Sequence, residues 1–326
     1  MRIPALISVL IGLAVLVGLV VMNGAAGIEA GIAAAGWGIL AVILMHLPQI
    51  LFSAQGWRAV VAVPRRPSAA AMFGMRLIRE AVNGLLPVAQ IGGDLVAVRL
   101  LARGGVPLSA AGASVTVDVT LEMLSQVAFT LLGVGLLMAT PGAAALPYLA
   151  AAALVAGLGI LVGIFITAQR FGFFRLLEGG LLRLARRLDW EGLEDLSGLH
   201  LAILALYRSP RRLIAGTACH FLSWLLGGFE VLVALHVLGI ACGPREAMII
   251  ESVGQASRAV GFAVPGGLGI QEGGVILICG LLGIGPQQAI ELSLLKRLRE
   301  LALGVPGLLV WYRIEGPRPA AAADPQ

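Results

Sequence analysis

The chain has 326 residues, of which 59% are hydrophobic and only 13% are charged, and its formal net charge is +5. A soluble domain of this length would carry about a quarter charged residues, so the composition excludes a soluble globular protein and indicates a polytopic membrane protein. The positive charge is concentrated in a few loops, where it reports orientation rather than nucleic-acid binding. The three cysteines, Cys219, Cys242 and Cys279, are too far apart for a metal site, and we expect no metal and no cofactor.

Apolar segments long enough to cross a bilayer lie at residues 3–22, 37–57, 109–137, 147–168, 212–238 and 286–311. The first segment begins like a signal peptide, but its apolar run of about 19 residues is longer than usual, so we expect an uncleaved span. Arginine clusters mark the cytoplasmic side. They predict a multi-pass protein of the bacterial inner membrane whose N-terminus, residues 170–211 and C-terminus are cytoplasmic.

Two segments between these spans cannot make a net crossing, because the arginine clusters must all lie on the cytoplasmic side and the full spans alone already bring the chain back to that side. One is 68–105, which contains Pro87, and the other is 246–284, which contains Pro265. We expect each to be a broken helical hairpin that turns near its proline, and we expect the two hairpins to enter from opposite sides. Parity leaves open whether each is re-entrant or crosses fully twice.

The fold class is therefore predicted as an all-α polytopic membrane protein with about six full spans, two broken or re-entrant hairpins and an inverted-topology repeat. Residues 1–316 form a single transmembrane domain, with unit A at 37–137 and unit B at 212–311. Between the units lie the span 147–168 and the linker 170–211, read either as a cytoplasmic amphipathic helix or as a solvated charged segment. The tail 317–326 is predicted to be disordered.

The two units share a spacing of charges and prolines. When Pro87 is aligned with Pro265, several charged or proline positions correspond: Glu80 with Arg258, Asp94 with Glu272, Pro107 with Pro286, and Asp118 with Arg297. The parity argument is independent of this alignment and gives the units opposite orientation. Inverted units of this kind are a transporter architecture, in which the binding site lies near the membrane midplane.

Charged residues occur at the middle of two predicted spans. Asp118 and Glu122 share one helix face because they are four residues apart. Each central charge costs about 3 kcal/mol on insertion scales, so these side chains must face inward and be paired or hydrated. The network could merely lock helices together, or it could form a polar pathway for a headgroup or a proton relay.

Several other polar residues receive weaker interpretations. Glu230 and Glu251 need buried partners, and Arg79 is expected to pair locally with its neighbour Glu80. His46, near Pro48, is read as the mark of a kink. His220 and His236 are read as lone helix histidines whose hydrogen bonds are satisfied.

One central polar cavity is predicted to gather the substrate-binding residues of both units. We expect the acids of unit A and the bases of the last span to attract one another across it, and the glycines to let the backbone approach a headgroup. No catalytic residue is predicted. The expected binding residues are Glu80, Asn83, Gly92, Gly93, Asp94, Asp118, Glu122, Arg258, Gly266, Gly267, Gly269, Glu272, Lys296, Arg297 and Arg299.

The pattern Asn83…Pro87…Gly92-Gly93-Asp94, with Pro265-Gly266-Gly267-Leu268-Gly269…Glu272, resembles the flippase-like transmembrane family of the lysylphosphatidylglycerol synthases. The resemblance covers residues from about 5 to 312. It implies lipid translocation between leaflets by a stand-alone membrane domain, without the soluble domain that transfers lysine. The chain is also similar to short members found beside lipid and glycolipid biosynthesis genes, including the hopanoid-associated group.

Three functions follow as hypotheses. The first is a flippase or transporter that moves a polar or anionic (glyco)lipid, hopanoid-related or not, between leaflets. The second is a non-catalytic partner or scaffold of a lipid-modifying enzyme, and the third is an integral-membrane lipid transferase. Membrane lipids and lipid-biosynthesis enzymes are the expected partners, and nucleic acid is not. The sequence leaves the lipid, the direction of movement, the energy coupling and the oligomeric state open.

Overall fold

The computed structural model describes residues 33, 35–86, 91–139, parts of 156–167, 198–260 and 269–315. The predicted span 3–22, the linker residues 170–197, the tail 317–326, and the two proline breaks with Gly266 and Gly267 lie outside the described residues. The described helices are α3 (Gly38–Val60), α4 (Ala69–Leu85), α5 (Gly92–Arg103), α6 (Leu108–Met138), α9 (Leu199–Tyr207), α10 (Pro210–Val237), α11 (Pro244–Val260), α12 (Ile270–Leu281) and α13 (Pro286–Glu315).

Three of these helices, α3, α6 and α10, are long and apolar enough to cross a membrane. Their bounds agree closely with the predicted spans 37–57, 109–137 and 212–238. The helix α13 has 30 residues, so it is about 45 Å long, but its middle is charged. The chain is thus a helical membrane protein, as its composition predicts.

The helices α4 and α5 form the first hairpin. Ser68 caps the start of α4 by accepting a hydrogen bond from the Ala71 N–H at 3.1 Å, and the chain turns sharply after α5 at Gly105, where φ is +86°. With 12 residues, α5 is about 18 Å long, which is shorter than the roughly 30 Å hydrocarbon core.

The helices α11 and α12 form the second hairpin. Gly269 precedes α12 with a φ of +81°, a conformation that favours glycine. Its backbone N–H donates to the Glu272 carboxylate at 2.7 Å, which satisfies one of the free amide groups at the helix start. Like α5, α12 has only 12 residues.

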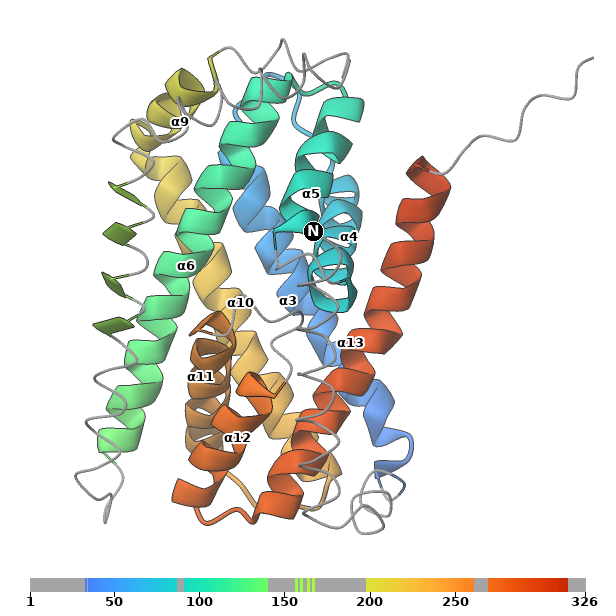
Figure 1. Cartoon of the computed structure of the whole chain (residues 1–326), viewed down its shortest axis with the longest axis vertical. Helices are drawn as coiled ribbons and strands as arrows, with labels where there is room; N and C mark the ends of the chain where they lie inside the picture. Colours follow the sequence, from blue (N-terminus) through green and yellow to red (C-terminus); the bar gives the residue numbers. More distant parts are fainter. Residues whose placement is uncertain are drawn as a thin grey trace, which may run out of the picture.

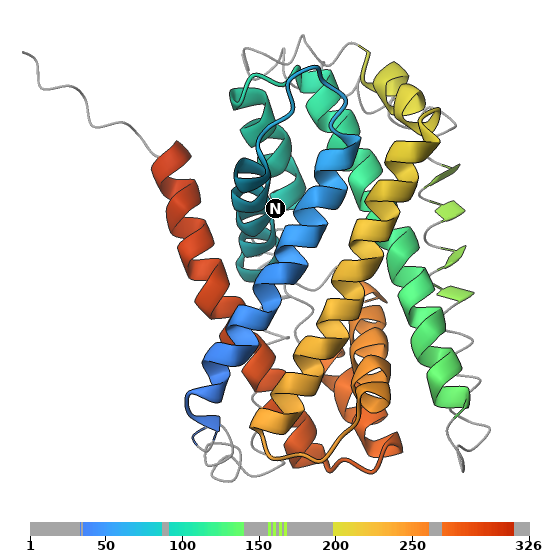
Figure 2. The same ribbon diagram turned by 180° about the vertical axis from the view of Figure 1, so that it is seen from behind.

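The two hairpins occupy opposite halves of the molecule. In Figure 1, α4 and α5 lie in the upper half, whereas α11 and α12 lie in the lower half. The helices α3 and α10 pack against each other at the centre, which Figure 2 shows from behind. The helix α13 packs against α4, and α6 packs against α11, so each hairpin contacts a long helix of the other unit.

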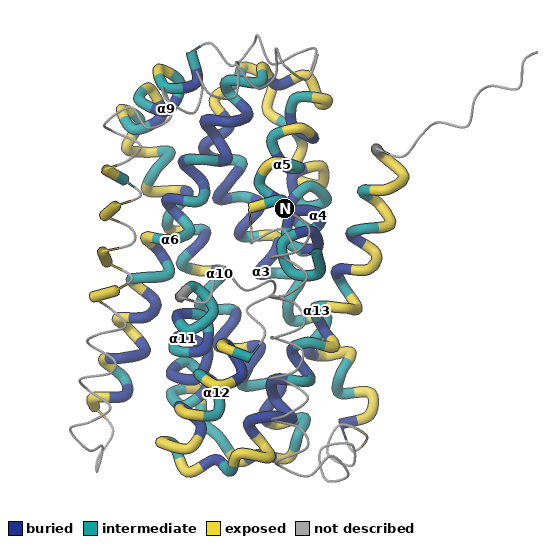
Figure 3. Tube along the Cα trace, viewed as in Figure 1, coloured by how far each residue is buried: buried dark blue, intermediate teal, exposed yellow. Residues whose placement is uncertain are grey.

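Three apolar clusters occur among the described residues, and polar residues separate the two larger ones. One cluster gathers Trp57, Leu101 and Leu121, and the other gathers Val42 and Leu292. On α3, the polar residues His46, Gln49 and Ser53 come between the two clusters in sequence. Figure 3 shows buried positions in both halves of the bundle. The fold therefore places a layer of polar side chains between two apolar cores.

Candidate functional site

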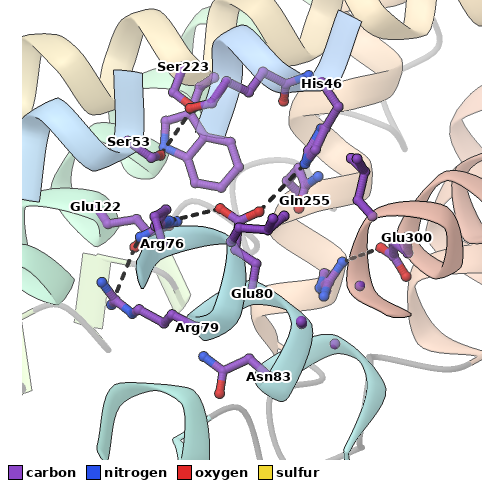
Figure 4. Close-up of a pocket in the computed structure, with 18 of the residues that line it drawn as sticks. His46, Ser53, Arg76, Arg79, Glu80, Asn83, Glu122, Ser223, Gln255 and Glu300 are labelled. Atoms are coloured by element: carbon purple, nitrogen blue, oxygen red, sulfur yellow. Dashed lines mark hydrogen bonds and ion pairs between the residues drawn. The ribbon is translucent and has the colours of Figure 1, made fainter. Parts of the chain in front are cut away.

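A cavity of about 310 Å³ lies in this polar layer, and we call it the central cavity. Residues of α3, α4, α5, α6, α10, α11 and α13 line it. Figure 4 shows that Arg76, Glu80 and His46 point toward one another across it. The ionisable lining residues are His46, Arg76, Arg79, Glu80, Asp94, Glu122, Arg258, Arg299 and Glu300.

The arginines of α4 bind the carboxylates of α6. Arg76 holds Glu122 with two hydrogen bonds, of 2.6 and 3.0 Å, and donates to Glu80 at 2.8 Å. This bidentate arrangement is the strong form of an arginine–carboxylate pair. Arg79 donates to Asp118, which is fully buried, and its Nε lies 2.6 Å from Asp94 of α5. The first hairpin is therefore fastened to α6 through charge.

One further contact fixes the position of the Arg79 side chain, and another holds α5 against α4 beside it. Its guanidinium lies 5.6 Å from the ring centre of Trp57, within the range of a cation–π interaction. The backbone N–H of Gly93 donates to the Asn83 side chain at 2.7 Å. A Cβ atom at Gly93 would lie 2.2 Å from the Arg79 carbonyl oxygen. Gly93 and Asn83 thus hold α5 tightly against α4, beside Arg79.

His46 of α3 lies where four helices meet. Its Nδ1 is 2.8 Å from a Glu230 oxygen of α10, and its Nε2 is 3.6 Å from a Glu80 oxygen of α4. The Arg299 guanidinium of α13 lies 2.8 Å from Nδ1 and 2.9 Å from Nε2, and it also pairs with Glu230 at 3.1 Å. Gln49 donates a second hydrogen bond to Glu230. One histidine thus contacts carboxylates and a guanidinium together.

These contacts join into one network whose ion-pair distances do not exceed 3.8 Å. His220 enters it through its Nε2, which is 2.8 Å from Asp118. We call it the His46 network, and its members are His46, Arg76, Arg79, Glu80, Asp94, Asp118, Glu122, His220, Glu230 and Arg299.

A second network lies in unit B. Glu300 pairs with Arg258 of α11 at 2.8 Å and with Arg297 at 2.7 Å, and Arg297 pairs with Glu272 of α12 at 2.8 Å. We call these four residues the Glu300 network. Nearby, Lys296 pairs with Glu251 of α11. The second hairpin is therefore fastened to α13 by charge, as the first is to α6.

The structure distributes the predicted binding residues over four places within its described part. The central cavity is lined by Glu80, Asn83, Asp94, Glu122, Arg258 and Arg299. Asp118 is buried behind Arg79, while Glu272, Lys296 and Arg297 line a cleft of about 10 Å³ that shares Glu300 with the cavity. Gly92, Gly93 and Gly269 stand at helix starts. Gly266 and Gly267 lie outside the described residues.

Two expectations about pairing are wrong. Asp118 and Glu122 do not face the bases of the last span, because Arg76 and Arg79 of the first hairpin already bind them. Arg79 does not pair with Glu80, which pairs instead with Arg76. The reason is helical geometry, since residues four apart share a face and adjacent residues do not.

Glu230 and Glu251 do have the buried partners that sequence reasoning required. Arg76 was missed, although its spacing of four residues from Glu80 was a usable signal. His46 was read only as a kink, although an ionisable residue within a span is itself a sign of function. His220 is in contact with Asp118, and His236 has a hydrogen bond to the Leu232 carbonyl at 2.8 Å.

The described residues therefore define a helical membrane protein with a charged cavity between two large apolar cores. Comparison with protein families shows that the chain matches the family described as "Lysylphosphatidylglycerol synthase TM region" over residues 6–307. The match covers most of the 326 residues, and the chain belongs to this family. No curated protein and no solved structure matches the chain.

Proposed function

We propose that the protein moves a polar or anionic lipid, such as a glycolipid or hopanoid-related lipid, between the leaflets of the bacterial inner membrane. The observation that carries this proposal is the central cavity, where charged side chains from both units line about 310 Å³ of space within an apolar bundle. Membership of a family related to lipid handling supports it. We propose transport without covalent chemistry on the lipid.

The lining of the cavity suits a lipid headgroup. A volume of about 310 Å³ lies within the usual range of ligand sites, and headgroups are of comparable size. An arginine that holds a carboxylate bidentately can hold a phosphate with the same two donors. Arg258 is suited to bind a phosphate, because its side chain is 20% exposed and its ion pair among the described residues is a single contact of Nη1 with Glu300. The carboxylates would offer acceptors to hydroxyl or amino groups.

We further propose that units A and B form an inverted repeat within a molecule of six full spans. Three features support it: the hairpins lie in opposite halves, α6 packs against α11 as α13 packs against α4, and Asp94 and Glu272 are each the third residue of a short helix. Re-entrant hairpins would let both helix breaks approach the midplane, which is the site of binding in transporters of this design.

The orientation is tested by cysteine labelling in intact cells and inverted vesicles. We propose cytoplasmic N- and C-termini, because arginines cluster there. A Ser197→Cys variant in a background without the native cysteines should react with an impermeant reagent only in inverted vesicles. Reaction in intact cells with a permeabilised outer membrane would reverse the orientation.

The proposed transport is tested with purified protein in vesicles that contain a labelled phospholipid or glycolipid. We expect the wild-type chain to let outer-leaflet quencher reach inner-leaflet label, and we expect Arg258→Gln to slow this about tenfold or more, the loss expected when a hydrogen bond to a charged group is removed. Arg211→Gln, at an exposed position of α10, is the matched control and should behave as wild type. Equal rates for wild type, Arg258→Gln and empty vesicles would refute transport.

A second candidate is a scaffold for a lipid-modifying enzyme. The observation that favours it is that the ionisable residues lining the cavity all have partners, as a network that only fixes helix packing would. Under this alternative, folded variants of cavity residues would leave lipid movement in vesicles at the background level. The scaffold alternative would be supported if a lipid-biosynthesis enzyme co-purified with the protein. The enzyme should be lost when a surface helix is altered and the cavity is left intact.

A further inference from the structure

The His46 network carries unequal numbers of positive and negative groups. It contains five carboxylates and three arginines, and its remaining members are the two histidines. With both histidines neutral, its formal charge is 3 − 5 = −2. The Glu300 network has two arginines and two carboxylates and is balanced, as is the pair of Lys296 with Glu251.

A buried excess of negative charge is costly at this place. The network lies between two apolar cores in a membrane protein, where uncompensated charge is solvated only in part. Each proton that the network binds removes one unit of the excess. The two histidines supply as many sites as there are excess charges, and each already contacts a carboxylate. Histidine and carboxylate chains within membranes commonly serve as proton relays.

Of the two histidines, His46 is the one placed to exchange a proton. It lines the central cavity, and its side chain is 15% exposed. His220 is 1% exposed, and its Nδ1 has no hydrogen-bond partner among the described residues. A proton that enters through the cavity therefore reaches His46 more readily than His220, and both ring nitrogens of His46 face carboxylate oxygens.

The neighbours of His46 respond to its proton in opposite ways. Glu80 from α4 and Glu230 from α10 attract the protonated ring. Arg299 from α13 donates to a ring nitrogen, which requires the lone pair of the neutral form, and is repelled by the charged form. From α6, the fourth helix packed on α3, Glu122 reaches the same cavity but is held by Arg76. Protonation would thus favour the contacts to α4 and α10 over the contact to α13.

We propose that His46 is a proton-binding site that couples the central cavity to the pH on the side to which the cavity opens. The proton is the coupling ion, and its arrival weakens the contact between Arg299 and α3. This inference rests on the proposed lipid transport for its consequence, but the proton site itself is a property of the protein that can be measured without transport.

The proton site is tested by histidine-selective nitrogen NMR on the full chain in lipid nanodiscs. The protein has four histidines, and the signal that disappears in His46→Gln identifies His46. We expect this signal to change between its neutral and charged forms between about pH 5 and pH 8, the range in which histidine commonly titrates. We expect Arg299→Gln to move the change to higher pH, because a competing cation is removed. The proposal is overturned if the His46 signal stays in one form over the whole pH range, both in the wild type and in Glu80→Gln, which leaves His46 in place.

The coupling is tested by lipid movement in vesicles under imposed pH gradients, with sodium replaced by N-methylglucamine in a parallel series. Over the pH range in which only a small fraction of His46 is in the protonation form that transport requires, we expect the wild-type rate of lipid movement to change about tenfold per pH unit. His46→Gln should reduce this dependence to less than about twofold, and His236→Gln, at an exposed position, should retain it. A pH dependence that is unchanged in His46→Gln, or a dependence on sodium alone, would overturn the coupling. Lipid that never moves while His46 titrates would refute transport but support the proton site.

Discussion

The ion pairs that fasten the two hairpins differ in sign. Between α4 and α6, the bases Arg76 and Arg79 stand on the hairpin and the acids on the long helix, whereas the pairs of Lys296 with Glu251 and of Arg297 with Glu272 place the acids on the second hairpin and the bases on α13. The pair of Arg258 with Glu300 has the reverse sign. Both arrangements fasten a short hairpin to a long helix. They differ in balance, because the arginines of the Glu300 network equal its carboxylates in number and the His46 network depends on two histidines. One network can therefore act as a fixed lock, while the other can change its charge.

The largest effect is expected when a base is removed from the His46 network. Arg79→Gln leaves the fully buried Asp118 without its closest arginine, and breaking a buried pair in this way costs about 3–5 kcal/mol. The apparent melting temperature in detergent should fall sharply. Arg79→Lys, which keeps the charge but not the forked donor geometry, should lie between the variant and wild type. Melting of Arg79→Gln at the wild-type temperature would show that this network does not hold the hairpin.

The next effect concerns how closely each hairpin is packed. A Cβ atom at Gly93 would lie 2.2 Å from a backbone oxygen of α4, so Gly93→Ala should destabilise the protein by about 1–3 kcal/mol. Gly84→Ala is the matched control on α4, because a Cβ there would meet nothing within 4 Å, and it should be neutral or slightly stabilising. Equal melting temperatures for the two variants would contradict the close contact of α4 and α5.

In the second hairpin the corresponding substitution should cost less. A Cβ atom at Gly274 would meet the Ser257 Oγ at 2.2 Å and the Ser257 Cβ at 2.6 Å. The hydroxyl can rotate away, which leaves the 2.6 Å contact, whereas the 2.2 Å contact of Gly93 is with a backbone carbonyl that cannot rotate away. Gly274→Ala should therefore lower the melting temperature less than Gly93→Ala does. A larger loss for Gly274→Ala would mean that the second hairpin is the more rigid of the two.

The smallest effect is expected within the Glu300 network. A double-mutant cycle of Glu272→Gln and Arg297→Gln should give a coupling energy of about 0.5–3 kcal/mol in thermal or chemical unfolding. The Glu300 network contains no histidine, so none of these variants should alter the pH dependence of stability near neutrality. His46→Gln, by contrast, should alter it. A coupling energy near zero would show that this ion pair does not fasten the second hairpin to α13.

The long helices could be predicted because their boundaries are marked in the sequence. Pro107 precedes α6 and Pro286 is the first residue of α13, and apolar runs fix the rest, so the bounds differ by only a few residues from those predicted. The shared spacing around the two proline breaks matched Asp94 with Glu272, and the structure places each of them as the third residue of a short helix. These features are local, and local features can be read from one sequence.

The pairing of charges could not be predicted, because it depends on how each helix is rotated against its neighbours. Asp118 could have faced Arg297 or Arg79 on charge alone, and only the packing of α4 against α6 decides between them. Arg76 is not among the predicted site residues, because the sequence predicts its helix only as one arm of a broken hairpin and not as a packing surface. The contacts of His46 come from α4, α10 and α13, and the sequence alone does not show that these three helices surround it.

The central claim, that lipid passes through the central cavity, is tested most directly by blocking that cavity. Gly84 lines it, and a side chain there would enter open space, so Gly84→Cys can be made in a chain whose native cysteines are replaced. Gly74→Cys is the matched control on the same helix, at a position with equal space but outside the cavity lining. After a bulky, reversible thiol reagent has modified both variants fully by mass spectrometry, lipid movement in vesicles should stop in Gly84→Cys, return on reduction and continue throughout in Gly74→Cys. Unchanged lipid movement in fully modified Gly84→Cys would contradict the account.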